Sequence, residues 1–405
     1  MRVLNEVTNP GTGSIWGNRS FVMLWLGQCF SQGADRLIFI LLVELVTRLD
    51  PAPRTLSVAL AATTVPNVLF GALAGVWADR IDKRHVMMLS NLVRAGLVLA
   101  LSLIGGGHVV LAIAIACLIA MAAQPFVPAE AGAIPATVER HALMEANAVS
   151  ALTMVGAVVV AYTVGEPLIH ASGTLVGSVV IAAAFGASTL CLAQVKFLHP
   201  PEMRPRTGWW LELKEGLDYI RRRGGVRRTM AFQVIIFSTF AALSVLAILF
   251  AKNVLQTNFS WLLASGGVGL GVGAWLIGRW GTRWSQDLSI VTGFAATGAA
   301  LFGLSGMGPE QMRLAFVLTF VAGFMASVVG VPLQTRLQER VEDALRGKVF
   351  GVQNTVLNAV AIIPLAGTGF LLEWCELPTV LRGLSLIMFT TALAAWVARL
   401  SASHR

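Results

Sequence analysis

The sequence predicts an all-α integral membrane protein with twelve transmembrane helices in two pseudo-symmetric six-helix bundles. Three observations predict this fold: the composition, the number of long apolar runs, and an internal repeat. Of the 405 residues, 56% are hydrophobic and only 13% are charged, and the mean hydropathy is +0.73. Soluble domains carry roughly 25% charged residues. A soluble fold of this length could not bury so much apolar surface, so lipid must cover much of the protein.

The apolar runs fall into two groups of six. A helix needs roughly 20 predominantly apolar residues to cross the hydrocarbon core of a bilayer. Such spans are predicted at 20–47, 56–77, 86–105, 109–127, 143–168, 173–195, 229–252, 260–279, 287–306, 312–334, 350–372 and 379–398. The longest polar stretch separates the sixth span from the seventh. The sequence therefore predicts one bundle over 1–196, a linker over 197–228 and a second bundle over 229–405.

Lys and Arg are unevenly distributed between alternate loops. If the N-terminus is cytoplasmic, most of the 30 basic residues fall in cytoplasmic segments, and the linker holds the largest group. The loops on the other side then hold only Arg48, Arg54, Lys252, Arg313 and Arg382. Because cytoplasmic loops of membrane proteins carry an excess of basic residues, we expect an even number of spans with both termini in the cytoplasm.

Two segments of the first half recur in the second. The segment 75–84, GVWADRIDKR, ends the second span, and 274–283, AWLIGRWGTR, ends the eighth. Val127-Pro128 precedes a Val-Glu pair at 138–139, just as Val331-Pro332 precedes one at 341–342. Two matches at nearly one offset indicate a duplicated six-helix unit. Parallel repeats of this kind place the substrate site between the halves, near the bilayer midplane.

The linker contains a predicted amphipathic helix. Trp209, Trp210, Leu213, Leu217 and Ile220 recur at helical spacing, and charged residues occupy the remaining positions. This pattern favours a helix that lies on the cytoplasmic membrane surface, with its Arg-rich end near anionic headgroups. The alternative is a solvated helix that only tethers the two halves.

The loop after the second span carries a family resemblance. The signature of the major facilitator superfamily in this loop recurs here as Gly75, Asp79, Arg80, Lys83 and Arg84. Asp82 stands where the signature has glycine, although Asp also tolerates turn conformations. The position of the loop and the twelve-span layout agree with the match. The chain therefore resembles a transporter of this superfamily, and the resemblance implies that the loop takes part in gating.

Three further segments resemble one branch of the superfamily. Residues 126–135, 213–221 and 338–351 are similar to bacterial efflux permeases that include macrolide, siderophore and lysophospholipid exporters. This resemblance implies a multi-pass protein of the bacterial cytoplasmic (inner) membrane that exports a small molecule or a lipid. We expect it to act as a monomer.

The charges of the signature loop allow a physical account of gating. Asp79 lies at a helix end, where its carboxylate can meet the positive end of a facing helix that begins near Gly347. Arg80 and Arg84 can pair with an acid of a neighbouring loop, such as Glu130 or Glu139. These contacts would close the cytoplasmic side and break when it opens. Alternatively, the basic residues that end the motif only anchor the loop at the membrane, and Glu130 is an ordinary loop acid.

The first span contains charges that need a reason. A charge at the centre of a membrane helix costs roughly 2.5–3.5 kcal/mol on insertion scales. Asp35 and Arg36 lie near the middle of this span, and Glu44 lies nearer its outer end. We expect Asp35 to line the cavity and to bind a proton or a cationic group of the substrate, with Arg36 and Glu44 on a neighbouring stripe. The alternative is that partners neutralise Asp35 and Arg36, which then only stabilise packing.

The second half offers amides in place of charges. Gln353, Asn354 and Asn358 in the eleventh span could line the cavity, or could instead hold helices together. Spans seven and eight carry no charge before their ends, so their wall suits a lipophilic or amphipathic substrate better than a sugar. In the fifth span, Glu166 interrupts the glycine-proline pair of the antiporter motif, which gives only a weak indication of antiport.

The sequence as a whole predicts a secondary active transporter that exports an amphipathic or lipophilic small molecule by alternating access and is coupled to protons. One alternative is a lysophospholipid flippase-type transporter that takes its substrate laterally from the bilayer, and another is a non-transporting receptor. Enzyme activity is not expected, because no Walker A or H-E-x-x-H motif occurs and the six histidines do not cluster. We therefore expect no cofactor and no metal. The expected partners are the substrate, the proton and membrane lipids, and not nucleic acid.

Overall fold

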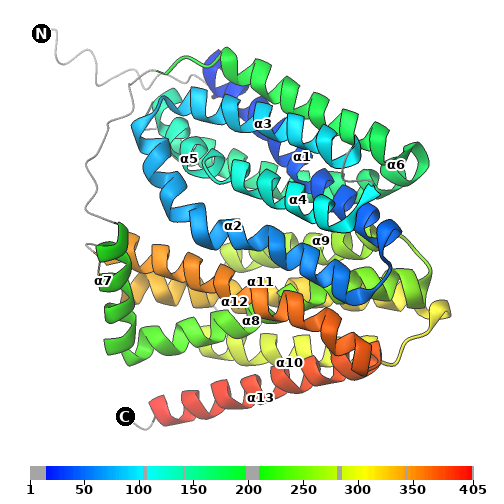
Figure 1. Ribbon diagram of the computed structural model, residues 1–405. Coiled ribbons are helices and arrows are strands. Elements are labelled where there is room, and N and C mark those ends of the chain that lie inside the picture. The colour runs from blue at the N-terminus through cyan, green and yellow to red at the C-terminus, as the bar shows by residue number, and fades with distance from the viewer. Residues whose placement is uncertain are drawn as a thin grey trace, which may run out of the picture.

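The computed structural model describes residues 15–103, 107–139, 142–197, 209–280, 285–342 and 345–403. Within these ranges, the side chains of 72–80, 144, 148, 151–152, 155, 209–213, 280, 346–347 and 401–403 are not described. The described chain is almost entirely helical, and its long helices run side by side in two groups (Figure 1).

The first group follows a short 3₁₀ turn at Ile15–Gly17. It contains α1 (Arg19–Leu49), α2 (Pro53–Arg80), α3 (Lys83–Leu103), α4 (Val109–Ala123), α5 (Phe126–Thr137) and α6 (Leu143–Ala193). The side chain of Asn18 begins α1 by accepting hydrogen bonds from the backbone amides of Ser20 and Phe21 at 3.0 and 3.2 Å. This is the usual way to satisfy the free amides of a first helical turn.

Two boundaries of the first group differ from the predicted spans. The predicted span 109–127 is longer and consists of α4 and α5, which Pro125 separates, because proline lacks an amide hydrogen and disturbs the preceding turn. The predicted spans 143–168 and 173–195 are joined in α6, and Gly173 interrupts it with φ of 84°. Glycine adopts this left-handed conformation without steric cost, so the chain changes direction there without a loop.

The second group follows the helix α7 (Trp209–Arg222). It contains α8 (Gly224–Phe250), a short π-helix η4 (Ala251–Leu255), α9 (Phe259–Trp280), α10 (Gln286–Leu304), α11 (Met312–Arg340), α12 (Arg346–Trp374) and α13 (Leu377–Ser403). A 3₁₀ turn, η6 (Pro309–Gln311), precedes α11. We call the end of the bundle where α1 begins and α13 ends the terminal end, and the opposite end the far end (Figure 1).

The helices have the length and composition of membrane spans. In the part of the chain that the structure describes, nine helical segments are long and apolar enough to cross a bilayer. These include Val109–Thr137, which joins α4 and α5, and Gly156–Ala193 of α6. The strongly charged α1 and the partly described α2 are 31 and 28 residues long and lie alongside these segments. The architecture therefore agrees approximately with the predicted twelve spans of a helical membrane protein.

The two groups contact one another along two helix pairs. The helix α2 packs along α12, and α6 packs along α9. Near the far end, α12 approaches α2 closely at Gly369, where an added Cβ atom would lie 2.5 Å from the carbonyl oxygen of Pro53. Only glycine leaves room for this approach, as is common where membrane helices pack tightly.

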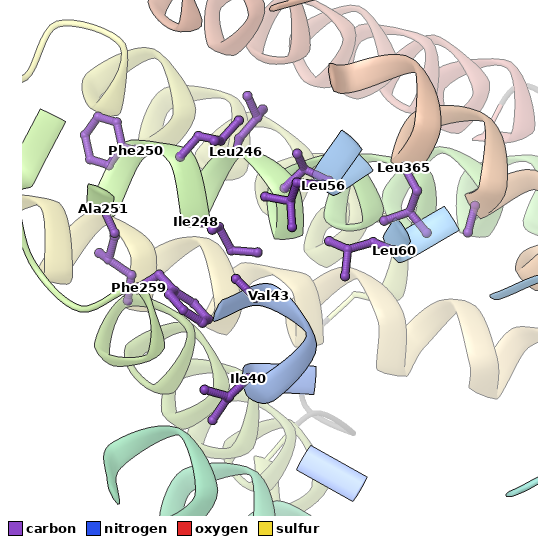
Figure 2. Packing of buried hydrophobic residues seen from close by; sticks show 14 of the residues in the cluster. Ile40, Val43, Leu56, Leu60, Leu246, Ile248, Phe250, Ala251, Phe259 and Leu365 are labelled. Atoms are coloured by element: carbon purple, nitrogen blue, oxygen red, sulfur yellow. The ribbon is translucent and has the colours of Figure 1, made fainter. Parts of the chain in front are cut away.

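A buried apolar cluster joins the groups towards the far end. Figure 2 shows Ile40 and Val43 of α1 beside Ile248 and Phe259 of the second group. In the same view, Leu56 and Leu60 of α2 lie near Leu246 and Leu365. Ile40, Val43 and Phe259 are fully buried. This packing closes the far end between the two halves.

The helix α7 packs differently from the prediction. Leu217 and Ile220, which we expected to face the membrane, instead pack in a cluster with Val226, Leu337 and Val352 of α8, α11 and α12. Tyr219 of α7 donates a hydrogen bond to the carbonyl oxygen of Arg340 at 3.1 Å, and Lys348 pairs with Glu215. The predicted contacts of Trp209, Trp210 and Leu213 fall on side chains outside the description. The described apolar face of this helix is therefore a docking surface for the second half.

Candidate functional site

The centre of the first half contains a buried ion pair. A guanidinium nitrogen (Nη1) of Arg94 in α3 lies 2.6 Å from Oδ1 of Asp35 in α1. The side chain of Arg94 is fully buried, whereas that of Asp35 is 39% exposed. The pair therefore has one face closed by protein and one face that is open. Charge-assisted hydrogen bonds of this length are the strong ones.

Arg94 is held from several directions besides Asp35. Its second terminal nitrogen donates to Ser31 Oγ at 3.0 Å and to Asn91 Oδ1 at 2.5 Å, and its Nε donates to the Ser90 carbonyl at 3.3 Å. Ser90, Asn91 and Arg94 share one face of α3 because residues three and four apart lie one above another in a helix. These contacts satisfy the buried guanidinium and fix its orientation.

Two aromatic rings complete the surroundings of the arginine. The guanidinium carbon lies 4.9 Å from the centre of the Phe126 ring and 4.5 Å from that of Phe185. A cation over an aromatic face is attracted by the ring quadrupole, and more strongly when both are removed from water. The positive charge of Arg94 is thus retained inside the helix bundle.

A second carboxyl group lies close to the ion pair. Glu130 of α5 is 8% exposed and lies within electrostatic reach of Asp35 and Arg94, beside Gln32. Its Oε1 atom accepts no hydrogen bond from the described residues, and neither does Oε1 of Gln32. The structure thus places Glu130 in the interior beside the ion pair, so the expectation of an ordinary loop acid was wrong.

The equivalent region of the second half contains amides. Gln353 of α12 donates through Nε2 to Gln233 Oε1 at 2.9 Å and to Gln334 Oε1 at 2.8 Å. Gln233 Nε2 also donates to Gln334 Oε1 at 3.1 Å. Asn354 lies apart from this cluster, and its carbonyl oxygen accepts a local bond from Asn358 at 2.8 Å. Of the three predicted amides, only Gln353 belongs to an interhelical network.

Glu44 lies at the far end rather than in the centre. Its carboxylate is 3.5 Å from Nζ of Lys252 in η4 and 3.7 Å from Nδ1 of His170 in α6. Lys252 also donates to Thr47 Oγ1 at 2.9 Å. Arg36 lies near Tyr162 of α6. The structure therefore separates Asp35, Arg36 and Glu44, which we had placed on neighbouring stripes of one helix face, into three different environments.

Glu166 joins the halves by a charge-assisted hydrogen bond. Its Oε2 accepts a hydrogen bond of 2.7 Å from the backbone amide of Ser260, in the first turn of α9. Glu166 is 6% exposed. A carboxylate at a helix N-terminus is favoured by the free amides and by the helix dipole. The acid that interrupts the predicted antiporter motif is thus a cap supplied to a helix of the other half.

The described ion pairs between the halves lie at the far end. Among the pairs whose partners are both described, two connect the groups: Glu44 with Lys252, and Arg54 with Glu373 at 3.3 Å. The second of these is well exposed and contributes little. Together with the Glu166 cap and the apolar cluster, the two pairs form what we call the far-end seal.

The signature loop is only partly described. Gly75, Asp79 and Arg80 lie in the last turns of α2, and their side chains are outside the description. Arg84 donates to the carbonyl oxygen of Val195 at 3.3 Å, and the Lys83 side chain lies against Gly132 of α5.

The structure gives a reason for Asp82 at the position where the signature has glycine. Its Oδ1 accepts a hydrogen bond of 2.8 Å from the backbone amide of Arg84, next to the first residue of α3. Asp is among the best residues for this capping position. The substitution of glycine by Asp therefore gives α3 a defined start.

Two apolar hollows lie away from the ion pair. One of about 200 Å³ lies within the second half, mainly between α8, α9 and α11, and is lined by Phe240, Leu263 and Phe250 among others. The other, of about 400 Å³, runs between α1 and α6 and is lined by Trp25, Gly33 and Val164 among others. Both offer surfaces for apolar groups rather than for hydrated ones.

The comparison with known families decides the assignment. The sequence profile of the Major Facilitator Superfamily matches residues 24–365. The chain belongs to this superfamily. It is therefore a secondary transporter that works by alternating access, and the superfamily is one of transporters, not of enzymes. Two related proteins support this assignment.

One of these relatives is YfiS of Bacillus subtilis, which is 25% identical over 384 residues, covering 88% of this chain and 87% of YfiS. The other is y4rN of Sinorhizobium fredii, which is 24% identical over 347 residues, covering 83% of this chain and 84% of y4rN. Both are described as uncharacterized MFS-type transporters. These relatives support the superfamily and name no substrate.

Solved structures of other transporters share the fold. A point mutant of the nucleoside transporter NupG aligns with a TM-score of 0.76 at 12% identity, covering 93% of this chain and 99% of that one. The POT family transporter PepTSo aligns with a TM-score of 0.75 at 11% identity, covering 96% of this chain and 99% of that one. A bacterial homologue of the lysosomal transporter Spinster aligns with 0.68 at 14%, covering 94% and 95%. At such low identity the likeness concerns the fold alone.

Sequence reasoning missed the partner of Asp35. In the sequence, Arg94 lies in the third predicted span towards its cytoplasmic end, a position typical of an arginine that pairs there or extends to the interface. The available signal was that only Arg36 and Arg94 are basic residues away from the ends of the predicted spans, and that a membrane-buried acid needs a cation. The cross-bundle roles of Glu166 and Lys252 left no comparable pattern, because their partners are 94 and 208 residues away.

Proposed function

We propose that this transporter exports an amphipathic or lipophilic small molecule in exchange for protons. The observation that carries the proposal is the half-exposed Asp35 paired with the fully buried Arg94. An acid whose side chain is partly exposed can exchange a proton. The buried arginine beside it links a change in the charge of this acid to the packing of the surrounding helices. The antiport, the direction of export and the substrate class are all parts of this proposal.

The coupling step follows from the contacts of Arg94. When Asp35 accepts a proton, its carboxyl no longer attracts the guanidinium as an ion, and α1 and α3 lose their strongest link. Arg94 stays in place because Ser31, Asn91 and Ser90 still accept its hydrogen bonds. Glu130, close by, is a second group that can take a proton or receive the freed positive charge. Protonation thus loosens one helix contact without leaving a bare cation.

Alternating access requires that the far-end seal open. We propose that residues 1–196 and 229–405 move as two units joined by 197–228, and that the signature residues Asp79 and Arg80 act at the terminal end. Opening the far end would break the Glu44–Lys252 pair and the Glu166 cap on α9. The basic-residue distribution supports a cytoplasmic terminal end, in a bacterial inner membrane, with the protein acting as a monomer.

The apolar hollows support the substrate class. The space within the second half has an almost entirely hydrocarbon lining, which suits an apolar substituent and would leave the hydroxyls of a sugar without partners. A lysophospholipid transporter is the second candidate. The hollow between α1 and α6 favours it, since an acyl chain could reach that space sideways from the bilayer.

The test uses purified protein in proteoliposomes with an imposed pH gradient. Wild-type protein should move fluorescent amphipathic dyes in a gradient-dependent manner, and Asp35→Asn should reduce that transport at least tenfold. Glu310→Gln, which neutralises an exposed acid at the far end, is the matched control and should transport normally. Undiminished gradient-dependent transport by Asp35→Asn would overturn the coupling role. Transport of lysolipids but not of dyes would select the second candidate.

A further inference from the structure

A polar pocket of about 100 Å³ lies at the terminal end of the second half. It is formed where α8 and α10 begin and where α11 and α13 end. Its charged lining consists of four arginines and one aspartate: Arg228, Arg336, Arg340, Arg399 and Asp287. The lining is therefore strongly positive. None of these residues belongs to the ion pair of the first half or to the far-end seal.

Among the residues whose side chains are described, an acid neutralises only one arginine of the pocket. A terminal nitrogen of Arg336 lies 2.7 Å from Asp287 Oδ1, and Nε of Arg336 donates to Gln286 Oε1 at 2.9 Å. Arg340 donates to the backbone carbonyl of Gly225 at 3.0 Å. Among the residues whose side chains are described, no carboxylate lies within ion-pair distance of Arg228, Arg340 or Arg399.

The remaining charge predicts the chemistry of a ligand. Guanidinium groups present several donors in a planar fork that matches the oxygens of phosphate or carboxylate. Several such groups around one small space repel one another unless an anion lies between them. A phosphate group with its charged oxygens can contact more than one of them at once, so the pocket is suited to a phosphate ester.

The surroundings indicate where such a phosphate ester comes from. The outer faces of α10 and α13 beside the pocket expose large apolar residues, with Leu288 at 43%, Leu393 at 63% and Val397 at 56%. Trp396 is 41% exposed and carries Arg399 over its ring at 5.3 Å. Exposed Leu and Val next to Trp and Arg are typical of the boundary between hydrocarbon and headgroups. Acyl chains can thus lie along these helices while a headgroup enters the pocket.

We propose that this pocket binds the phosphodiester headgroup of an anionic phospholipid from the leaflet at the terminal end. Arg228, Arg340 and Arg399 contact the phosphodiester, while the Asp287–Arg336 pair forms one wall. Basic pockets between membrane helices are known to hold anionic headgroups. Because the lining comes from α8, α10, α11 and α13, the bound lipid ties together four helices of the second half.

The test measures lipid affinity of the purified full chain in detergent. Phosphatidylglycerol is titrated, and the apparent dissociation constant is read from the rise in unfolding temperature. Arg228→Gln/Arg399→Gln should weaken the affinity roughly thirtyfold, since each arginine contributes about 1 kcal/mol to binding of anionic lipid. The matched control is Arg221→Gln/Arg222→Gln, which removes two exposed arginines of α7 at the same end, outside the pocket. It should bind as wild type does.

Further measurements identify the source of the phosphate and distinguish a loss of binding from misfolding of the variant. Phosphatidylcholine and inorganic phosphate at matched concentration should not protect the wild type, and Arg228→Lys/Arg399→Lys should recover most of the affinity. Equal loss in the α7 control would mean a general surface-charge effect and would overturn the pocket. Equal protection by inorganic phosphate would overturn the lipid assignment. A pocket variant that binds as tightly as wild type would overturn the proposal as a whole.

Discussion

The two halves of the protein use the same repeated segment for different chemistry. Two residues after the Val-Pro pair at 127–128 stands Glu130, and two residues after the pair at 331–332 stands Gln334. Glu130 lies beside the Asp35–Arg94 ion pair, whereas Gln334 accepts hydrogen bonds from Gln233 and Gln353. The duplication kept the proline and the helix. At this position the first half has a carboxyl group, which can titrate, and the second half has an amide, which cannot.

This difference indicates a division of labour between the halves. The amides of the second half bond to one another across three helices, so their geometry does not depend on pH. The first half retains a buried carboxyl whose Oε1 accepts no hydrogen bond from the described residues. Buried polar groups left partly unsatisfied usually have a functional reason. The first half is therefore suited to respond to a proton, and the second to provide a fixed wall.

The largest expected effect is on stability and concerns Arg94, the buried cation of the first half. Arg94→Gln should lower the free energy of unfolding by about 3–5 kcal/mol, because it breaks a buried ion pair from its fully buried side. Gln233→Leu, in the second half, should lower the free energy of unfolding by only about 1–3 kcal/mol. This is the penalty for leaving its buried amide partners without a hydrogen bond. Denaturant unfolding of both purified variants in one detergent checks this order. A larger loss for Gln233→Leu would contradict the comparison.

The next effect concerns the joint between the halves. Glu166→Leu should shift the population towards a conformation open at the far end by roughly ten- to a hundredfold, because it removes a charge-assisted bond worth about 1.5–3 kcal/mol. Spin labels at residues 48 and 311, in a background without the four native cysteines, should report longer distances between the halves. Glu145→Leu, at an exposed acid of α6 towards the terminal end, is the control and should leave the distances unchanged.

An exchange of the repeated residues tests the division directly. Glu130→Gln should change the free energy of unfolding by less than about 1 kcal/mol, since an amide avoids burying a charge. Gln334→Glu should cost about 1–3 kcal/mol, because the amide network offers no cation to a new carboxylate. Unfolding measurements at neutral pH compare the two. Equal costs would mean that the halves do not differ in their tolerance of charge.

The smallest effect concerns the far-end turns of the two halves. The turn after α1 contains Asp50, whose pKa is lowered by a hydrogen bond from Thr55 at 2.6 Å and by another from the Ala52 amide at 2.9 Å. The turn after α8 has no such carboxylate cap within its described residues and ends at Gln256 with φ of 51°.

A lowered folded-state pKa stabilises the protein above the unfolded value of about 3.9, and this contribution is lost as pH falls through the folded value. Thr55→Val should therefore slightly lower the unfolding temperature at pH 7 and converge with wild type as pH falls below the folded-state pKa of Asp50. Thr63→Val, which removes a hydroxyl bonded to the Leu60 carbonyl, should show no such convergence. A pH-independent difference for Thr55→Val would exclude the carboxylate as its cause.

Much of the fold could be predicted from the sequence because its signals are local. Apolar runs of the required length gave the spans, and the repeat gave two related halves. The boundaries that failed depend on single residues in packed surroundings. Gly173 lets α6 change direction without a loop, and Pro125 splits a longer crossing. Neither outcome follows from hydropathy, which averages over a window.

The candidate site could be predicted only in part. Asp35 could be found from the cost of a charge in the bilayer, and Gln353 from its polarity within a span. Their partners could not, because Arg94 lies 59 residues from Asp35, and Gln233 lies 120 residues from Gln353. Which side chains meet depends on how each helix is rotated about its axis and where it crosses its neighbours.

The sequence by itself determined that this chain is a helical membrane transporter of two related halves, because hydropathy and repeats are properties of neighbouring residues. The tertiary structure alone decided that the first half pairs a half-exposed acid with a fully buried arginine. It also decided that the buried amides of the second half form hydrogen bonds to one another. It also decided that Leu217 and Ile220 of α7 pack on the second half. These outcomes rest on contacts between distant helices, and such contacts form only when the bundle packs.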